Sequence, residues 1–426
     1  MKNPNSEPPG RRAQVSKTSN VIPLLNSSLP QVRPQSRTSS RSSSRFASVD
    51  QAVYALRPDM PVYCLRPATI ASTAKWFLKQ FPGDVLYAVK TNPDPMALSC
   101  LARAGVKHFD VASLAEVKLV AEYAPRAEMF FMHPVKSREA IASAYYEYGV
   151  RSFSLDTMDE LNKILQVTGC AQDLNLYVRL SIPNNHAAMS LCGKFGIAVT
   201  EAAELLAATR KVAANLGVCF HVGSQCMNPE AYSIAMDLVA ELLAQTGVKL
   251  DVLDIGGGFP SVYPGLTPPP LGDYMKAIRK ALKDHPSFDG CRIICEPGRA
   301  LVAEGGSTVV RVELRKGNML YINDGVYGSL FDAGTPGFVY PVRALRPGGK
   351  LEDEMEAFSF YGPTCDSLDA MRGPFHLPRD IKEGDWIEIG QLGAYGATMR
   401  TNFNGFSSDK VVEVGDKPML SMFGIN

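Results

Sequence analysis

From about residue 61 to residue 300, short apolar runs alternate with segments whose apolar residues recur every three to four positions. The short runs are typical of buried β-strands, and the periodic segments are typical of amphipathic α-helices. The pattern predicts strands at 84–90, 106–111, 128–132, 151–155, 174–180, 217–222, 250–255 and 291–296. Between them it predicts helices, for example at 112–123, 137–148, 157–167, 201–214 and 228–246.

Strictly alternating strands and helices predict parallel strands joined by right-handed crossovers. Eight such units in about 240 residues match the size of a (β/α)8 (TIM) barrel. A doubly wound open sheet is the alternative, but no Gly-x-Gly-x-x-Gly pattern follows the first strand to support it. We therefore expect a (β/α)8 barrel over residues 66–300.

The pattern changes after residue 300. Apolar or alternating runs at 308–314, 319–322 and 386–389 are separated by loops rich in Gly, Pro and Asp, with no long helix between them. This predicts an antiparallel β domain over residues 301–426, either a sandwich or a small barrel. Residues 47–65 also look strand-like, and we expect one or more strands from this segment to join the β domain.

The first 46 residues differ from the rest in composition. They are rich in Ser, Arg and Pro and carry eight basic residues and one acidic residue, a charge of +7 in a chain whose total is +1. Such a segment buries too little apolar surface to fold, which predicts a disordered tail. An organelle transit peptide has a similar composition and remains the alternative.

The remaining residues therefore carry a charge of −6, which argues against a nucleic-acid-binding body. The nine cysteines are scattered, with no Cys-x-x-Cys pair and no zinc-ligand spacing, so we expect free thiols, no metal site and a cytoplasmic protein. No apolar run reaches about 18 residues, so we expect no membrane partner.

Polar or glycine residues occur at the carboxyl end of nearly every predicted barrel strand. In a barrel these ends converge on one mouth, where such enzymes place their chemistry. A single residue of this kind is more simply a turn residue, but a series in register favours a site. The series consists of Lys90, Asp110, His133, Asp156, Arg179, His221, Gly256-Gly257-Gly258 and Glu296.

Lys90 ends the apolar run Val85-Leu86-Tyr87-Ala88-Val89 and is followed at once by a Thr-Asn-Pro turn. One interpretation is a solvated lysine at a strand end. The other is an amine held in a pocket to form a Schiff base.

Two motifs occupy the loops after the last two barrel strands, where barrels often bind phosphate. Gly256-Gly257-Gly258 lets backbone N–H groups approach an anion, although a flexible turn is the simpler interpretation. In Glu296-Pro297-Gly298-Arg299, the arginine can bind two phosphate oxygens. Glu296 is a strand-end carboxylate that needs a cationic partner if it is buried.

Two further motifs carry candidate chemistry. His221 precedes Val222-Gly223-Ser224 and could act as a metal ligand, a base or a flat surface against an aromatic ring, while Ser224 could donate to phosphate. No second pair of metal ligands has suitable spacing. The loop Tyr361-Gly362-Pro363-Thr364-Cys365-Asp366-Ser367 combines a thiol with a carboxylate, and a buried cysteine beside a capping aspartate is the simpler interpretation.

These motifs occur in a characteristic order. Tyr-Ala-Val-Lys at 87–90, Phe-Asp-Val-Ala-Ser at 109–113, His-Val-Gly-Ser at 221–224, Gly-Gly-Gly-Phe-Pro at 256–260, Glu-Pro-Gly-Arg at 296–299 and Tyr-Gly-Pro-Thr-Cys-Asp-Ser at 361–367 follow one another. Over residues 50–420 this strongly resembles the ornithine/lysine decarboxylase branch of the alanine-racemase-like (fold type III) pyridoxal-phosphate enzymes. The Cys-Asp loop points away from diaminopimelate decarboxylases and racemases.

The resemblance implies roles for individual residues. Lys90 would carry pyridoxal 5'-phosphate as a Schiff base, Glu296 would keep the ring nitrogen protonated and His221 would stack on the ring. Cys365 would donate the proton after carbon dioxide leaves. The resemblance also implies a homodimer in which the partner subunit supplies the Cys-Asp loop, so that both subunits share each active site. The phosphate and the surrounding polar contacts would involve Asp110, Glu116, Arg179, Ser224, Gly256, Gly257, Gly258, Pro297, Gly298, Arg299 and Tyr395.

For the substrate, the resemblance implies Asp366, Asp332, Tyr327 and Tyr395. Asp332 follows Asp324-Gly325-Val326-Tyr327-Gly328-Ser329 by only three residues, which is a shorter spacing than in the eukaryotic ornithine enzymes. The expected reaction is ornithine to putrescine, with lysine to cadaverine second, since one methylene gives only about 1–3 kcal/mol of discrimination. Decarboxylation of arginine, diaminopimelate or carboxynorspermidine, and a non-catalytic regulator, are the alternatives.

Overall fold

The computed structural model describes residues 44–183, 187–189 and 193–424. The predicted disordered tail therefore lies outside the described residues, except for its last three positions. Arg45 and Phe46 form strand β1 (Arg45–Phe46), which pairs in parallel with β20 (Val411–Val414). The predicted end of the tail at residue 46 is therefore too late, because composition does not reveal that a strand more than 350 residues away pairs with this stretch.

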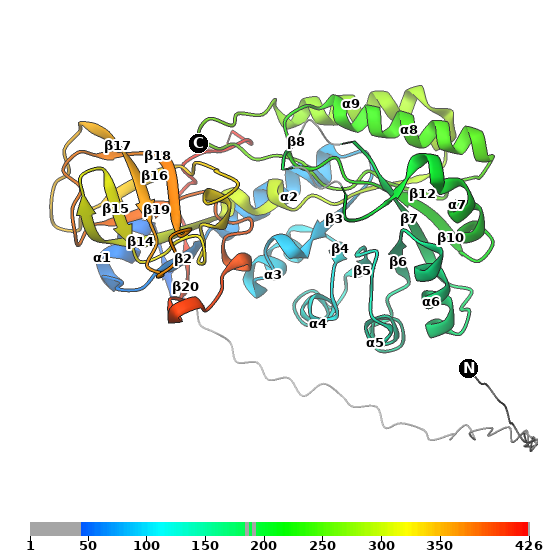
Figure 1. Cartoon of the computed structure of the whole chain (residues 1–426), viewed down its shortest axis with the longest axis horizontal. Coiled ribbons are helices and arrows are strands. Elements are labelled where there is room, and N and C mark those ends of the chain that lie inside the picture. Colours follow the sequence, from blue (N-terminus) through cyan, green and yellow to red (C-terminus); the bar gives the residue numbers. More distant parts are fainter. Residues whose placement is uncertain (1–43, 184–186, 190–192, 425–426) are drawn as a thin grey trace, which may run out of the picture. The chain divides into compact units, whose positions relative to one another are not determined.

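Parallel strands form a closed ring in the described part of the chain, and Figure 1 labels most of these strands. Strand β10 pairs with both β7 and β12, and β13 returns to β3, where Ile294 lies opposite Asp84. This closure confirms the predicted barrel and excludes the open doubly wound sheet. The ring strands are β3 (Asp84–Ala88), β4 (His108–Val111), β5 (Glu128–Phe131), β6 (Ser152–Leu155), β7 (Asn175–Ser181), β10 (Asn215–Cys219), β12 (Val252–Asp254) and β13 (Arg292–Cys295).

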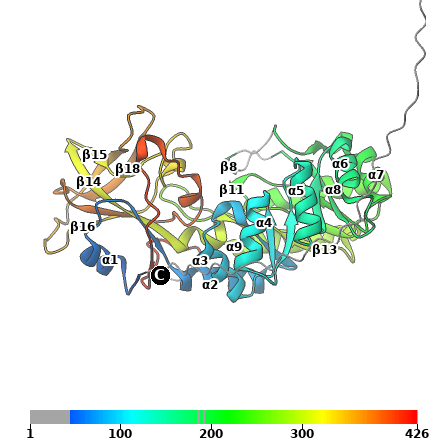
Figure 2. The same cartoon turned by 90° about the horizontal axis from the view of Figure 1, so that it is seen from below.

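Helices cover the outside of the ring (Figure 2). Ser113, Ser137 and Thr157 cap the starts of α4, α5 and α6 by accepting a backbone N–H, and Gly169 and Gly247 end α6 and α8 with positive φ. None of the described helices has both the length and the apolar character needed to cross a membrane. The helices are α2 (Pro67–Gln80), α3 (Pro95–Ala104), α4 (Leu114–Tyr123), α5 (Arg138–Ala142), α6 (Met158–Thr168), α7 (Ala202–Arg210), α8 (Glu230–Thr246), α9 (Leu271–Asp284) and α10 (Arg299–Val302).

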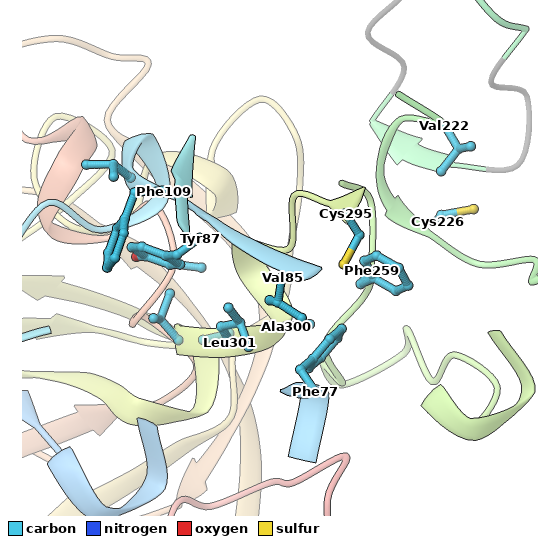
Figure 3. Close-up of a cluster of buried hydrophobic side chains, with 14 of the residues drawn as sticks. Phe77, Val85, Tyr87, Phe109, Val222, Cys226, Phe259, Cys295, Ala300 and Leu301 are labelled. Carbon is cyan, nitrogen blue, oxygen red and sulfur yellow. The ribbon is translucent and has the colours of Figure 1, made fainter. Parts of the chain in front are cut away.

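Apolar side chains pack on both faces of the ring strands. Leu86 of β3 belongs to the cluster inside the ring, together with Phe130 of β5. Its neighbour Val85 belongs to the outer cluster, which includes Phe77 of α2 and Phe109 of β4 (Figure 3). Burying such a side chain contributes about 1.5–3 kcal/mol, so the alternation along β3 fixes which way the end of this strand points.

A second, nine-stranded sheet forms the β domain. Most neighbours are antiparallel, as expected, but β1–β20, β2–β20 and β15–β17 are parallel. The predicted antiparallel domain therefore also contains these three parallel pairs, which arise because strands distant in sequence lie side by side. Besides β1 and β20, the strands are β2 (Val62–Leu65), β14 (Gly306–Lys316), β15 (Met319–Ile322), β16 (Val342–Leu345), β17 (Met355–Tyr361), β18 (Ala370–Pro378) and β19 (Trp386–Ile389).

The segment 47–65, predicted as strand, contains the helix α1 (Val49–Leu56) before β2. The strand prediction is wrong for this helix, which starts at a capping residue, Ser48, whose side chain accepts the N–H of Gln51. Strand β2 pairs antiparallel with β14, which follows the barrel. The N-terminal segment and the C-terminal strands therefore form one sheet.

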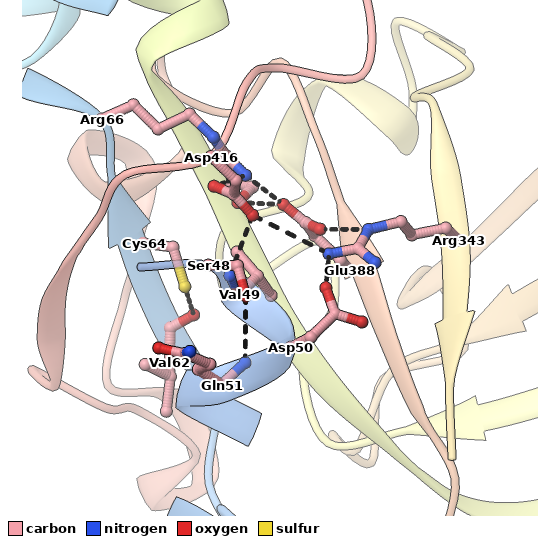
Figure 4. A network of polar contacts seen from close by, with 11 residues as sticks. Ser48, Val49, Asp50, Gln51, Val62, Cys64, Arg66, Arg343, Glu388 and Asp416 are labelled. Atoms are coloured by element: carbon pink, nitrogen blue, oxygen red, sulfur yellow. Dashed lines mark hydrogen bonds and ion pairs between the residues drawn. The ribbon is translucent and has the colours of Figure 1, made fainter. Parts of the chain in front are cut away.

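A buried ion network connects β2 to the rest of the β domain (Figure 4). Arg66 Nη2 lies 2.7 Å from Glu388 Oε1 and 3.0 Å from Asp416 Oδ1, and Arg343 Nε lies 2.6 Å from Glu388 Oε2. Burial opposes the charge on Glu388, but Arg66 and Arg343 outweigh it and lower its pKa. The carboxylate is therefore ionised and has a cation at each oxygen, which makes its burial tolerable.

Candidate active site

A cavity of about 540 Å³ opens at the carboxyl ends of the barrel strands. Its walls come from several ring strands and from two loops of the β domain. The positions singled out from sequence that line it are Lys90, Asp110, His133, Arg179, His221, Ser224, Glu296, Asp332 and Tyr395. The convergence expected at the barrel mouth is therefore present in space.

Lys90 lies just beyond strand β3 rather than inside it. The strand ends at Ala88, and the 3₁₀ turn η1 (Val89–Thr91) carries the lysine to the cavity. Its Nζ donates a hydrogen bond to Asp110 Oδ2 at 2.8 Å. Partial burial opposes the ammonium charge, but Asp110 and Glu296 outweigh this effect and raise the pKa of Lys90. The lysine is therefore an ammonium held in place by its hydrogen bond to Asp110.

The β domain supports the turn that carries Lys90. The backbone N–H of Tyr395 donates to Thr91 O at 3.0 Å, and Asn92 Nδ2 donates to Gly393 O at 2.9 Å. Both contacts join the barrel mouth to the loop that carries Tyr395. The position of the lysine therefore depends on the barrel and on the β domain together.

A second lysine near the mouth is chemically different from Lys90. Burial lowers the pKa of Lys136 to about 8, so its ammonium loses a proton more readily than an ordinary lysine does. However, its side chain is fully buried, its Nζ donates to His133 O at 2.9 Å, and it lies 3.0 Å from Glu160 Oε1. The amine of Lys136 is therefore already bound to groups of the protein. Lys90, whose side chain is 44 % exposed and borders the cavity, is the accessible one.

His221 presents a neutral ring to the cavity. Burial, together with Lys90 and Arg179, lowers the pKa of His221 to about 3. Its Nδ1 accepts the N–H of Gly223 at 3.0 Å, which orients the ring. A neutral, oriented imidazole is suited to stacking against an aromatic ring, and its low pKa makes it a poor base.

The groups around Glu296 determine whether its carboxyl group is ionised. Its Oε1 is buried without a hydrogen-bond partner among the described residues, while the residue also lines the cavity. Burial and Asp110 raise the pKa of Glu296 to about 7, opposed by Lys90 and Arg179. A protonated ring nitrogen placed beside it would supply the cation that this carboxyl group needs.

An anion-binding cup adjoins the cavity, lined by Thr91, Ser224, Gly258, Gly298 and Arg299, among others. Arg299 Nη1 donates to Tyr263 Oη at 2.8 Å, and its Nη2 lies 3.4 Å from Ser224 Oγ. Arg299 Nε and Thr91 Oγ1 are buried without partners in the described structure. A phosphate group would satisfy such donors, so the cup fits the phosphate of pyridoxal phosphate.

The glycines of the cup have no room for a side chain. A Cβ atom on Gly258 would lie 2.6 Å from Gly223 O, and one on Gly298 would lie 2.0 Å from Thr91 Oγ1. Gly258 also has a φ of +101°. Its backbone position therefore requires glycine, as a loop that wraps an anion with its N–H groups would.

Not every residue singled out from sequence borders the cavity. Glu116 Oε2 accepts the N–H of Ala112 at 2.7 Å at the start of α4, and burial raises its pKa to about 7. The carbonyl of Pro297 accepts the N–H of Ala88 at 3.4 Å. Asp332, in contrast, does line the cavity, and its Oδ2 lies 3.3 Å from Arg299 Nη2. The roles assigned to these residues from the resemblance remain predictions.

The Tyr327, Cys365 and Asp366 group is not among the residues that line the cavity in the described part of the chain. Cys365 is exposed, and Tyr327 Oη donates a hydrogen bond to Asp366 Oδ2. These three residues form a separate polar group in the β domain. Within one chain, the structure does not bring them to Lys90.

The cavity also contains residues that received no role from the sequence. His133, Lys194 and Phe195 line it, with the His133 and Phe195 rings 5.0 Å apart. The position of His133 at a strand end was a usable signal. Lys194 and Phe195 lie in a loop without periodicity, so only the three-dimensional structure reveals them.

The fold and the site define a barrel enzyme that binds pyridoxal phosphate. The sequence profile described as "Pyridoxal-dependent decarboxylase, pyridoxal binding domain" matches residues 67–303. The chain therefore belongs to the pyridoxal-dependent decarboxylase family and is a pyridoxal-phosphate-dependent amino-acid decarboxylase.

Known proteins support this membership. The "Lysine/ornithine decarboxylase" of Selenomonas ruminantium is 34% identical over 344 residues, covering 78% of this chain and 84% of that protein. "Antizyme inhibitor 2" of Xenopus laevis is 32% identical over 358 residues, covering 79% and 76%. The crystal structure of the Paramecium bursaria Chlorella virus arginine decarboxylase bound to agmatine has a TM-score of 0.76 and 28% identity, covering 86% and 99%.

The shape of the cup leads to a prediction. Gly258→Ala should weaken pyridoxal-phosphate binding at least about tenfold, because the added methyl group overlaps a carbonyl oxygen and the positive φ becomes strained. Gly272→Ala in α9 is the control, since a Cβ atom there meets nothing within 4 Å. Absorbance titration of the cofactor-free variants measures this effect. Equal affinities in the two variants would contradict the cup.

Proposed function

We propose that this enzyme decarboxylates a basic L-amino acid, with ornithine to putrescine as the main reaction and lysine to cadaverine as the second. The observation that carries this proposal is the combination of Lys90 at the cavity with an intact Cys365-Asp366 pair. The similarity to the lysine/ornithine enzyme also supports it. Asp366 would bind the distal ammonium group of the substrate, and Tyr327 orients Asp366 by its hydrogen bond.

The residues at the cavity would hold the cofactor in one orientation. Ser224, Gly258, Arg299 and Tyr395 would bind the phosphate, and His221 would lie against the ring. The backbone of the glycine loop also supports Glu296, because the carbonyl of Gly256 accepts the N–H of Glu296 at 2.8 Å. When bound, the protonated pyridine ring accepts the electron pair that the departing carboxylate leaves behind.

The residues of the chain control where protons go. Lys90 must release a proton from Nζ to act as a nucleophile, and Asp110 Oδ2, at 2.8 Å, is placed to accept it. Glu296 would hold the ring N–H as its counterion. Cys365 would carry on Sγ the proton that replaces the lost carboxylate. His221 remains neutral and orients the ring without taking part in proton transfer.

We also propose a homodimer whose active sites are shared. Cys365 and Asp366 need a second copy to reach a cavity, because they do not line the one in their own chain. Exposed apolar residues lie near the Cys365-Asp366 pair and at the cavity. Leu368, 72 % exposed, lies two residues after Asp366, and Phe331 and Met399 stand at the cavity with more than a third of their surface exposed.

We also propose that the enzyme is cytoplasmic. The eight cysteines in the described residues are all free thiols, which fits a cytoplasmic enzyme. Arginine, diaminopimelate and carboxynorspermidine are the alternative substrates. The similarity to an antizyme inhibitor keeps a non-catalytic regulator as the second candidate function, but the presence of Lys90 and Cys365 favours catalysis.

A substrate panel tests the reaction. Carbon dioxide release should show turnover of ornithine, with lysine lower by about 10- to 200-fold in kcat/KM because one methylene group differs. Asp366→Asn should raise KM for both substrates, since the distal ammonium loses a charged partner. Lys90→Ala is the inactive control. Turnover of none of the basic amino acids by the cofactor-loaded enzyme would contradict the proposal.

Mixing two inactive variants tests the shared site. Lys90→Ala and Cys365→Ala chains, dissociated and reassociated together, should recover about a quarter of wild-type activity, because half of the dimers are mixed and each mixed dimer has one intact site. Each variant alone, treated in the same way, is the control. If both residues act within one chain, the mixture recovers nothing.

A further inference from the structure

Asp254 is a buried acid outside the group of residues that line the cavity. It ends β12 and is 0% exposed. Glu296 follows the neighbouring strand β13, and Asp254 lies opposite Ile294 in the parallel register. Two carboxyl groups therefore stand side by side at the carboxyl ends of adjacent strands.

Both acids are hydrogen-bonded to Gly256, the first residue of the loop Gly256-Gly257-Gly258. Asp254 Oδ1 accepts the N–H of Gly256 at 2.8 Å. The N–H of Glu296 donates to the carbonyl of the same glycine, also at 2.8 Å. These backbone contacts fix the two acids relative to each other.

One oxygen of each acid lacks a hydrogen-bond donor. Asp254 Oδ2 and Glu296 Oε1 are both buried without a hydrogen-bond partner among the described groups. Two ionised carboxylates on neighbouring strand ends would repel each other in a medium of low polarity. A single proton shared between the two side chains removes the repulsion and supplies the missing hydrogen bond.

The surroundings decide which acid holds this proton. Asp254 is enclosed, and burial and the neighbouring Glu296 raise its pKa well above the usual range. Glu296 borders the cavity, where Lys90 and Arg179 favour its charged form. The proton therefore resides on Asp254.

Other titratable groups face the pair from neighbouring elements. Asp110 of β4 adds a negative charge, and Lys90 and Arg179 add positive charges. The thiols of Cys219 and Cys295 and the phenol of Tyr177 also face Asp254, and burial raises the pKa of each, so all three are neutral near pH 7. The charge on Glu296 therefore depends mainly on its partner Asp254 and on the charges around the cavity.

We propose that Asp254 is a positioning residue, whose carboxyl O–H donates to Glu296 Oε1 and so keeps Glu296 as the carboxylate that accepts the ring N–H of the cofactor. The proposal rests on the proposed contact between Glu296 and the ring nitrogen. Asp254 itself touches neither cofactor nor substrate. Asparagine at this position would mimic the protonated acid, because its amide N–H can donate where the O–H did and its oxygen can accept from Gly256.

Titration of the cofactor-free protein with pyridoxal phosphate between pH 6.5 and 9 tests this role. Each variant is compared with wild type at the same pH, so that titration of the phosphate and of Lys90 cancels. Asp254→Asn should stay within about twofold of wild-type affinity over the whole range, because the donor is retained. Asp254→Ala should bind about tenfold or more weakly at pH 7, because a hydrogen bond to a charged group is lost.

The alanine variant should recover affinity as the pH rises, because Glu296 then ionises without its donor. A loss in Asp254→Ala that does not change with pH would indicate a packing defect and would overturn the proposal. A large change in Asp254→Asn would also overturn it, because the proton would then reside on Glu296 in the wild type.

Glu296→Gln separates this test from the proposed function. It should weaken binding at every pH, because the ring nitrogen loses its anionic partner. Wild-type affinity in Glu296→Gln would remove the assumed contact with the cofactor, and with it the role of Asp254, while leaving the substrate panel unaffected. Circular dichroism of each variant confirms that it is folded before titration.

Discussion

The site is organised around the hydrogen bond between Lys90 and Asp110, which the register of two barrel strands makes possible. The lysine follows β3 and the aspartate lies on β4, and the two strands pair in parallel with Ala88 opposite Asp110. This register places a strand-end amine beside an acid of the next strand. Closure of the barrel adds Glu296, which arrives from β13 on the other side of β3.

The acids of the site lie close to cations because a buried charge needs an opposite charge nearby. The buried or half-buried acids Asp110, Asp254 and Glu296 face the cations Lys90 and Arg179. No single acid there is stable as an isolated charge, so each needs a cation or a proton. A cofactor that places its phosphate at Arg299 and its protonated nitrogen at Glu296 would bring an opposite charge to each of these two groups.

Many of the residues at the barrel mouth can be predicted from the sequence, because their positions depend on patterns within single strands and helices. Apolar runs ending in polar residues place Lys90, His221 and Glu296 at one mouth once eight strand–helix units are counted. The extent of β3 differs slightly, since the lysine lies on a 3₁₀ turn beyond the strand end. Helix α1 and the parallel pairs of the β domain escaped prediction, because capping and pairing between distant strands leave little periodic signal.

The contacts that depend on distant neighbours could not be predicted. The resemblance implied that Asp332 is a substrate ligand, and the folded chain adds a contact with Arg299 that the sequence did not reveal. Asp254 looks like an ordinary strand residue until Glu296 of the next strand lies beside it. Lys194 and Phe195 reach the cavity from an irregular loop. Each of these features comes from packing between elements, which the pattern within one element does not encode.

The most direct test of the central claim identifies the lysine that bonds to the cofactor. Borohydride reduction of the holoenzyme, followed by proteolysis and mass spectrometry, attaches the pyridoxyl group permanently to that side chain. We expect the label on Lys90, the amine that borders the cavity beside Asp110. A label on Lys136 or Lys194 instead would contradict this assignment.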